Sequence, residues 1–139
     1  ELELDPKVRV GIYEQEVSQE YFAMPLAEAI EKMYLSKGLS VTETKIRGLL
    51  SNYLFTSGDG MIPVSKLSGG QKARFQIIAM LANDPQLLIL DEPTNHLDLP
   101  SIEELEAALG KYAGAILYVS HDSYFQKNVG GEVTVVGYT

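Results

Sequence analysis

Two adjacent carboxylates, Asp91 and Glu92, follow a short apolar run in the second half of the chain. The run, residues 87–90, is entirely aliphatic, which is typical of a strand buried on both faces of a parallel sheet. Hydrolysis of a nucleoside triphosphate requires Mg²⁺ on the phosphate oxygens and a water molecule aimed in line. Asp91 is therefore the expected Mg²⁺ ligand, through a water, and Glu92 the expected base for the attacking water. Taken alone, the pair also fits two surface acids.

Two further polar residues follow apparent strands. His121 comes shortly after the apolar run 115–119, and Gln15 follows residues 7–13, in which polar and apolar residues alternate. His121 could donate a hydrogen bond to a γ-phosphate or hold the water, whereas a buried structural histidine is the alternative. Gln15 could ligate Mg²⁺ or orient the water through its amide oxygen, and an ordinary loop glutamine is the alternative.

A helix N-terminus is predicted where Leu67 is followed by Ser68, Gly69, Gly70 and Gln71. Ser and Gln at this spacing form a capping box, which opens a helix. The serine hydroxyl and the unhindered glycine amides would favour an anion there, because a helix N-terminus carries partial positive charge and free N–H groups. The alternative for this motif alone is an ordinary capped helix.

The remaining pattern predicts the elements that must position these residues. Helical periodicity, capping signals and Gly or Pro punctuation separate helices from strands and loops. The predicted strands are 7–13, 87–90, 115–119 and 132–136. The predicted helices are 25–38, a second helix opened by a capping box of Ser40 and Glu43 and ending near Phe55, a third from Gly69 to Pro85, and a fourth from Pro100 through Leu109, with a loop over 56–66.

Composition excludes several classes of protein. At 139 residues, 45% hydrophobic and 22% charged, the chain fits one globular domain, and without cysteine it has neither a disulfide nor a thiol nucleophile. No apolar run approaches the ~20 residues of a membrane span, so no membrane insertion is expected. The net charge of −8 disfavours binding to nucleic acid. We expect a cytoplasmic location and, since no initiator Met is present, a fragment or processed chain.

The phosphate-binding P-loop pattern G-x-x-x-x-G-K-[ST] is not found in the sequence. The one Gly-Lys pair, Gly110 and Lys111, has Leu105 at the position of the first glycine and Tyr112 at that of Ser/Thr. The chain thus carries candidate hydrolytic residues without the loop that would cradle the phosphates of its own nucleotide.

Three motifs in this order resemble the ABC ATPase superfamily: LSGGQ at 67–71, LLILDEPTNHLD at 87–98 and YVSHD at 118–122. The NHLD ending and GIYEQE at 11–16 resemble the ABC-F branch, and LSGGQKAR at 67–74 resembles the second of its two cassettes. The resemblance implies an α/β fold, a partial P-loop NTPase (RecA-like) parallel sheet with an inserted α-helical subdomain. The partial nucleotide-binding domain would span 1–139, with the helical subdomain and signature motif at 17–85 and the core at 1–16 and 86–139.

The resemblance also implies roles for single residues. ATP and Mg²⁺ are the implied ligands, and a second cassette the implied partner in a head-to-tail ATP sandwich, in which each signature motif completes the partner's site. The implied assignments are Gln15 as the Q-loop glutamine and a metal ligand, Asp91 as the magnesium aspartate, Glu92 as the base, His121 as the switch histidine, Asp98 as the D-loop aspartate at the cassette interface, and Ser68, Gly69, Gly70 and Gln71 as the signature residues facing the nucleotide.

Three functions remain open at this point. The first is the ATPase cassette of an ABC-F protein that acts on the ribosome, as a translation or antibiotic-resistance factor. The second is the ATPase subunit of a membrane transporter, which the NHLD ending disfavours. The third is a non-hydrolytic half-cassette that serves as an interaction module. We expect the chain to be part of a longer cassette, because loss of the P-loop strand would expose backbone and apolar surface. We expect it to be inactive alone, because it lacks the loop that would hold its own nucleotide.

Overall fold

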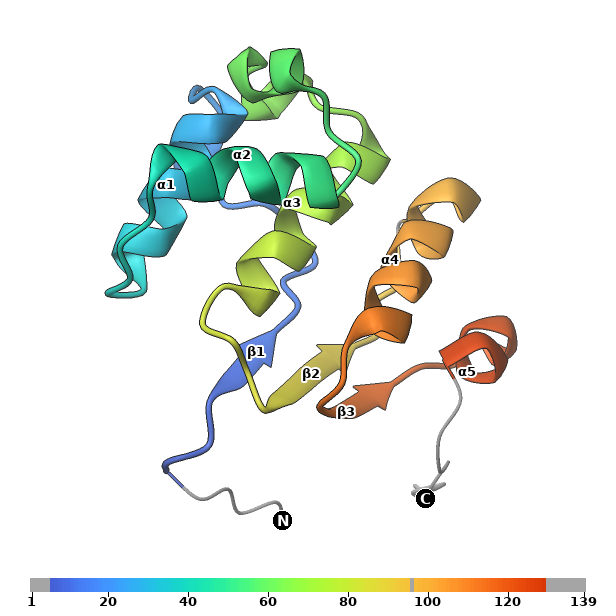
Figure 1. The fold of residues 1–139 in the computed structure, drawn as a ribbon. Helices are drawn as coiled ribbons and strands as arrows, with labels where there is room; N and C mark the ends of the chain where they lie inside the picture. Colours follow the sequence, from blue (N-terminus) through green and yellow to red (C-terminus); the bar gives the residue numbers. More distant parts are fainter. Residues whose placement is uncertain (1–5, 96, 130–139) are drawn as a thin grey trace.

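A parallel three-stranded sheet forms the base of the molecule. A computed structural model describes residues 6–95 and 97–129 (Figure 1). The strands β1 (Val10–Ile12), β2 (Leu87–Asp91) and β3 (Ala115–Val119) lie in the order β1-β2-β3, and all their pairings are parallel. The strand predicted over 132–136 falls outside the described residues. Since the three strands run in one direction, the residues that follow them gather at one edge.

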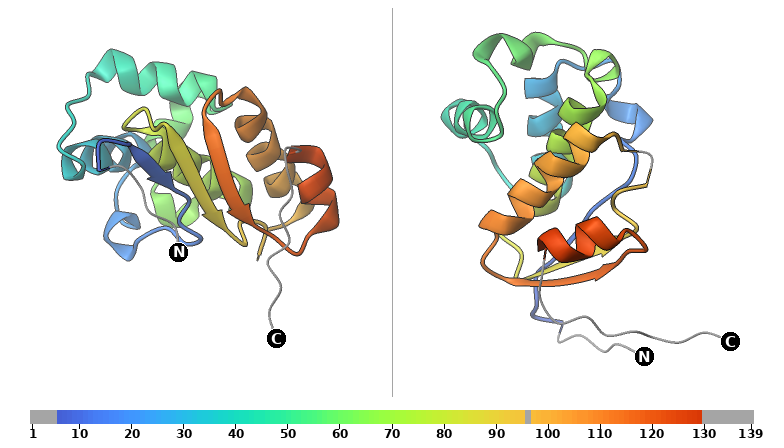
Figure 2. Two further views of the ribbon diagram at one scale, coloured as in Figure 1. Left: turned by 90° about the horizontal axis from the view of Figure 1, so that it is seen from below. Right: turned by 90° about the vertical axis from the view of Figure 1, so that its right-hand side faces the viewer.

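The helices lie on one side of this sheet (Figure 2). Helices α3, α4 and α5 lie above the strands, while α1, α2 and three short 3-10 helices lie beyond α3, away from the sheet. The bounds are α1 Leu26–Ser36, α2 Glu43–Asn52, α3 Gly69–Leu81, α4 Leu99–Lys111 and α5 Ser123–Val129, with 3-10 helices at Gln19–Tyr21, Ser57–Met61 and Val64–Lys66.

The opposite face of the sheet is apolar and is not covered by any described element. Ile12, Ile89 and Leu117 pair in register across the three strands, and the side chains of Ile12 and Leu117 are 55% and 44% exposed. The prediction that β2 is buried on both faces is therefore wrong for this structure. Leu88 and Leu90 are buried under the helices, whereas Ile89 is only half-buried because no described element packs on its side of the sheet.

Helix α3 joins two hydrophobic cores. Phe75 and Ile78 pack into a cluster formed with α1 and α2, while Ile77 and Met80 pack into the cluster between α4 and the sheet. Consecutive residues of a helix point about 100° apart, so different faces of α3 can pack into different hydrophobic cores. The signature helix is thus held by both parts of the molecule.

Several predicted element boundaries are corrected by the structure. The N-cap of α2 is Thr42, whose Oγ1 accepts a hydrogen bond from Lys45 N at 3.1 Å, so the predicted capping box of Ser40 and Glu43 is wrong. Thr42 lies next to the helix and satisfies its free amide directly, which Ser40 cannot do. The loop predicted over 56–66 contains two 3-10 helices. Helix α5 was not predicted.

The two ends of the helical block, defined here as residues 19–66, are hydrogen-bonded to each other. Pro25 and Pro63 form an isolated antiparallel bridge. On either side of it, Leu26 N donates to Ile62 O and Val64 N donates to Met24 O, each at 2.9 Å. The chain therefore enters and leaves the block through adjacent segments.

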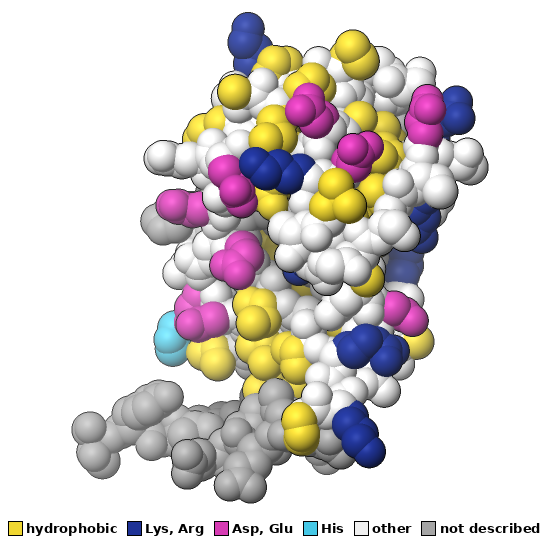
Figure 3. Space-filling model, turned by 90° about the vertical axis from the view of Figure 1, so that its left-hand side faces the viewer, with side chains coloured by type: hydrophobic (Ala, Val, Ile, Leu, Met, Phe, Trp, Pro, Cys, Tyr) yellow, Lys and Arg dark blue, Asp and Glu magenta, His cyan; other side chains and the backbone are white. Residues whose placement is uncertain are grey.

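Charged side chains are dispersed over the surface. On the face in Figure 3, acidic side chains are scattered among polar and apolar ones, with Lys and Arg between them. The net charge of −8 is thus not concentrated in one patch on this face.

Candidate functional site

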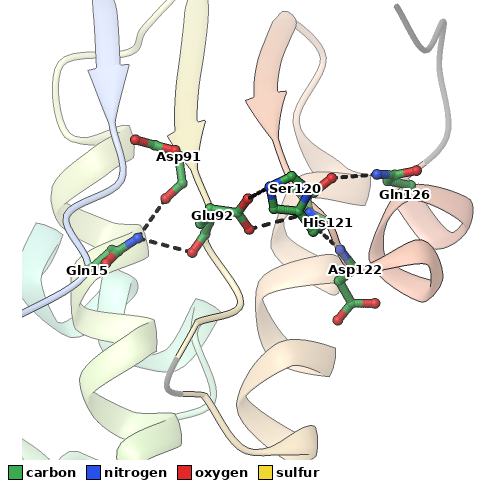
Figure 4. Close-up of polar contacts among 7 residues, drawn as sticks. All are labelled: Gln15, Asp91, Glu92, Ser120, His121, Asp122 and Gln126. Carbon is green, nitrogen blue, oxygen red and sulfur yellow. Dashed lines mark hydrogen bonds and ion pairs between the residues drawn. The ribbon is translucent and has the colours of Figure 1, made fainter. Parts of the chain in front are cut away.

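Four of the predicted site residues meet at the carboxyl ends of the strands (Figure 4). The side chain of Gln15 lies against the end of β2, where its Nε2 donates to the carbonyl oxygens of Asp91 at 2.7 Å and Glu92 at 3.1 Å. Both bonds use the amide nitrogen, so they leave the amide oxygen, the atom that could bind Mg²⁺, for other partners. The loop after β1 is thereby joined to the residues after β2.

Glu92 leaves the strand in a strained conformation. Its φ of 44° lies in the left-handed region, which is uncommon for a residue other than Gly and is tolerated where the surrounding structure holds it in place. Its backbone N donates to Val119 O at 2.8 Å, which holds the turn against β3. The change in backbone direction explains why the carboxylates of Asp91 and Glu92 do not share one orientation.

The Glu92 carboxylate faces His121. Oε1 of Glu92 is buried and accepts no hydrogen bond of good geometry, and His121 Nε2 lies 3.2 Å from it. The backbone N of His121 donates to Oε2 at 3.4 Å. A buried carboxylate oxygen without a hydrogen bond is a costly arrangement, and the imidazole of His121 is the polar group beside it.

The segment around His121 is anchored by its backbone rather than by its ring. The His121 side chain is 92% exposed, so a buried structural histidine is excluded. Gln126 Nε2 donates to Ser120 O at 2.5 Å, and Asp122 N donates to Ser120 Oγ at 3.0 Å. Asp122 then begins α5 by accepting from Phe125 N. An exposed ring on a fixed backbone can reach a ligand without a large rearrangement of the chain.

Asp91 offers an exposed carboxylate at the same edge. Among the described residues it takes part in no ion pair, and no group of three or more His, Cys, Asp or Glu residues forms a metal cage there. Mg²⁺ usually binds one or two protein oxygens and keeps water and phosphate oxygens as its other ligands. The oxygen donors of Asp91 and Gln15 fit that requirement.

The signature residues form a second group at the start of α3. Gln71 N donates to Ser68 Oγ at 3.1 Å and Ser68 N donates to Gln71 Oε1 at 2.9 Å, so the predicted capping box is confirmed. The amide oxygen of Gln71 is used within the cap. The first-turn amides of Gly69 and Gly70 have no acceptor within an α-helix, and they remain the groups suited to an anion.

Asp98 belongs to this second group. Its Oδ1 accepts from Ser101 N at 3.0 Å and Ser101 Oγ at 2.5 Å and so caps α4. The hydrogen bond from the Ser101 side chain, followed by that from its backbone, lowers the pKa of Asp98. Ser101 is fully buried, and a Cβ on Gly70 would lie 3.5 Å from its hydroxyl oxygen. The first turns of α3 and α4 are therefore in close contact.

Two residues near the site were missed in the sequence: Ser101 and Gln76. They are the buried polar side chains among the described residues, and Gln76 Nε2 donates to Glu14 O, next to Gln15. A glutamine within the apolar stretch 75–78 was the available signal. Tyr13, the buried residue that follows β1, has its pKa raised to about 12 by burial.

The chain is similar to known proteins. The profile of one family, described as ABC transporter, matches residues 5–95, more than half of the chain. The chain belongs to that family. Among its relatives, ABC transporter F family member 5 of Arabidopsis thaliana is 39% identical over 141 residues, covering 97% of this chain and 20% of that protein. The ribosome protection protein VmlR of Bacillus subtilis is 35% identical over 122 residues, covering 88% and 21%. The ABC-F type predicted from the motifs is thus confirmed.

The comparisons also bear on the fold. An ABC transporter solved in an inward-facing conformation superposes with a TM-score of 0.71 at 18% identity, covering 88% of this chain and 52% of that one. The predicted fold class, a parallel α/β sheet of the P-loop NTPase type, is confirmed. The chain spans about a fifth of the length of the curated relatives it matches. Within the described residues, none of the helices has the length and apolar composition needed to cross a bilayer.

Proposed function

We propose that the chain is part of an ABC-F cassette that binds and hydrolyses ATP in a longer cytoplasmic protein. The observation that supports this proposal most directly is the convergence of Gln15, Asp91, Glu92 and His121 at one sheet edge. An amide oxygen and a carboxylate can bind Mg²⁺, a second carboxylate can accept a proton from water, and an imidazole can donate a hydrogen bond to a phosphate oxygen.

Each of these residues has a separate task in this proposal. Asp91 and Gln15 hold Mg²⁺ through oxygen atoms, and the metal, when bound, neutralises charge on the phosphate oxygens. Glu92 accepts a proton from the attacking water at Oε1, the oxygen that lacks a hydrogen bond in the structure. His121 donates a hydrogen bond from its exposed ring to the γ-phosphate. Its contact with Glu92 keeps the ring beside the base.

The second group serves a second cassette, in the same chain or in a dimer. Ser68, Gly69 and Gly70 present a hydroxyl and amides to the partner's ATP, with Gln71 supporting them through the cap. Asp98 lies beside these residues through Ser101, which suits a role at the interface between cassettes. Because this set is separate from the hydrolytic residues, each cassette contributes to two nucleotides.

The open sheet face supports a longer cassette. An apolar row of Ile12, Ile89 and Leu117 that faces solvent would be unfavourable in a finished domain. We propose that the remaining part of the nucleotide-binding domain, including a P-loop, covers it. In this arrangement residues 17–85 form the helical subdomain, residues 1–16 and 86–139 belong to the core, and the isolated chain is inactive.

Replacing Glu92 tests the ATPase proposal. In the full-length protein, Glu92→Gln should lower ATP turnover by ~10² to 10⁴, because it removes the base, while ATP binding is retained. Turnover is measured as phosphate release and binding as ATP retained on gel filtration. Glu103→Gln makes the same charge change at an exposed position of α4 and should leave both unchanged. Unaltered turnover in Glu92→Gln would exclude Glu92 as the base, and a wild-type protein without turnover would favour the interaction module.

The same variant tests the proposed partner. VmlR, a relative at 35% identity, is named as a ribosome protection protein, which supports the ribosome as the target. If so, Glu92→Gln with ATP should sediment with ribosomes more strongly than the wild-type protein does, because hydrolysis no longer releases it. Sedimentation that does not depend on ATP would contradict this part of the proposal.

A further inference from the structure

The side chain of Gln76 lies at the seam between the two hydrophobic cores. It is 6% exposed and stands on α3 between Phe75, which packs with α1, and Ile77, which packs with the sheet. A buried amide is costly unless it is hydrogen-bonded. The side-chain amide of Gln76 donates not to another residue of α3 but to the carbonyl oxygen of Glu14, in the loop after β1.

This bond is the first of a series that leads to the proposed hydrolytic residues. Gln76 Nε2 holds the carbonyl of Glu14, and the next residue, Gln15, donates to the carbonyls of Asp91 and Glu92. The backbone ladder ends just before this point, with Tyr13 N donating to Ile89 O at 3.1 Å. Beyond Tyr13, the chain leaves the sheet.

The loop itself has little other support. Glu14, Gln15 and Glu16 are all exposed, so burial does not fix their positions. Gln76, in contrast, is fixed by the close packing of α3 on both sides. The hydrogen bond from Gln76 to Glu14 therefore fixes the position of the loop more than it affects the packing of the core.

We propose that Gln76 is a positioning residue, which holds the loop after β1 so that the Gln15 side chain stays against the end of β2. This inference rests on the proposed ATPase function. It gives α3 a role in the site of its own cassette, in addition to the proposed role of its first turn at the ATP of the partner cassette. Gln76 contacts neither nucleotide nor metal in this proposal and acts through Gln15 alone.

The test replaces Gln76 by Met in the full-length protein. Methionine has similar length and suits a buried site but cannot donate a hydrogen bond. Loss of one hydrogen bond of ordinary strength should lower kcat by about fivefold. The Mg²⁺ concentration for half-maximal turnover should rise by a similar factor, while the KM for ATP at saturating Mg²⁺ stays within about twofold, since binding of ATP does not depend on Gln76.

Gln86→Met is the matched control. Gln86 also bonds the backbone next to β1, since its Oε1 accepts from the N–H of Arg9, the residue before the strand, at 3.1 Å, but it lies at the opposite end of the strands. This variant should leave kcat and the Mg²⁺ requirement unchanged. An equal effect of both substitutions would show that any loss of a strand contact lowers activity, and would overturn the assignment.

A double-mutant cycle separates positioning from a direct role. In a Gln15→Ala background, Gln76→Met should have no further effect on kcat, because the group it positions is gone. A full fivefold loss in that background, or no loss in the wild-type background, would overturn the proposal.

Hydrogen exchange distinguishes failure of this inference from failure of the ATPase proposal. If the wild-type protein does not hydrolyse ATP, the proposed function fails, yet amides of residues 14–16 should still exchange faster in Gln76→Met than in Gln86→Met. Equal exchange of these amides in the two variants would overturn the positioning role, whatever the activity.

Discussion

At the scale of single residues, Asp98 shows how one side chain can join two functional elements. Its carboxylate is the N-cap of α4, and the Ser101 hydroxyl that it holds lies against the glycines of α3. Sequence alone places Asp98 at a cassette interface by resemblance but does not reveal this link, because it depends on packing between helices far apart in the chain.

The lowered pKa of Asp98 predicts a loss of stability at acid pH. Its folded-state pKa lies below the ordinary value of 3.8, so the ionised cap stabilises the fold above that value, and this contribution is lost as pH falls below it. Asn also caps helices but does not titrate. Below about pH 4, the melting temperature of Asp98→Asn should therefore gain relative to that of the wild type, because the wild type loses its ionised cap and the variant does not. In a Ser101→Ala background the gain should shrink, and a difference independent of pH would contradict the assignment.

At the scale of elements, local patterns predicted most of the structure. The capping box of Ser68 and Gln71 and the aliphatic run of β2 are local signals, and both are observed. Helix α5 was not predicted because it is short and therefore shows little periodicity. Its cap, Asp122, directly follows His121, so the segment fits a functional loop equally well. The Gln76 contact was missed because it joins residues 62 positions apart.

Gly11 lets β1 approach α3 closely. A Cβ there would lie 2.4 Å from Met80 O and 2.9 Å from Leu88 Cδ2, so backbone would have to move. Gly11→Ala should therefore lower the free energy of unfolding by about 1–3 kcal/mol. Gly48, exposed in α2 with open space around it, is the control, and Gly48→Ala should raise it by about 0.5–1 kcal/mol. Chemical denaturation measures both, and a Gly11→Ala variant as stable as wild type would show that β1 can shift away from α3.

At the scale of the whole molecule, the sheet has one finished face and one open face. The helices cover Leu88 and Leu90 completely, while Ile12 and Leu117 remain about half exposed on the other side. The aliphatic sequence of β2 predicted burial of both faces of the strand. Such a run indicates that both faces are covered, but it does not indicate which segment of the protein covers each face. The discrepancy therefore marks a surface that another part of the protein should cover.

Leu117→Lys tests whether that surface is covered in the full-length protein. If it is, the substitution should lower the free energy of unfolding by about 2 kcal/mol or more, since an apolar contact is lost and a charge is buried. Leu35, 59% exposed near the end of α1, is the control, and Leu35→Lys should change it by less than about 0.5 kcal/mol. Equal, small effects of the two substitutions would indicate that the sheet face is solvated in the complete protein.

The paired ends of the helical block have a consequence for how such proteins diversify. Met24 is hydrogen-bonded to Val64, and Leu26 to Ile62. These bonds hold the two ends of the block together independently of the packing of its helices. A segment with adjacent, mutually bonded ends can lengthen, shorten or be exchanged for another without moving the strands on which it is inserted. The bridge between Pro25 and Pro63 therefore lets the helical block change in length without displacing the sheet edge that carries the carboxylates.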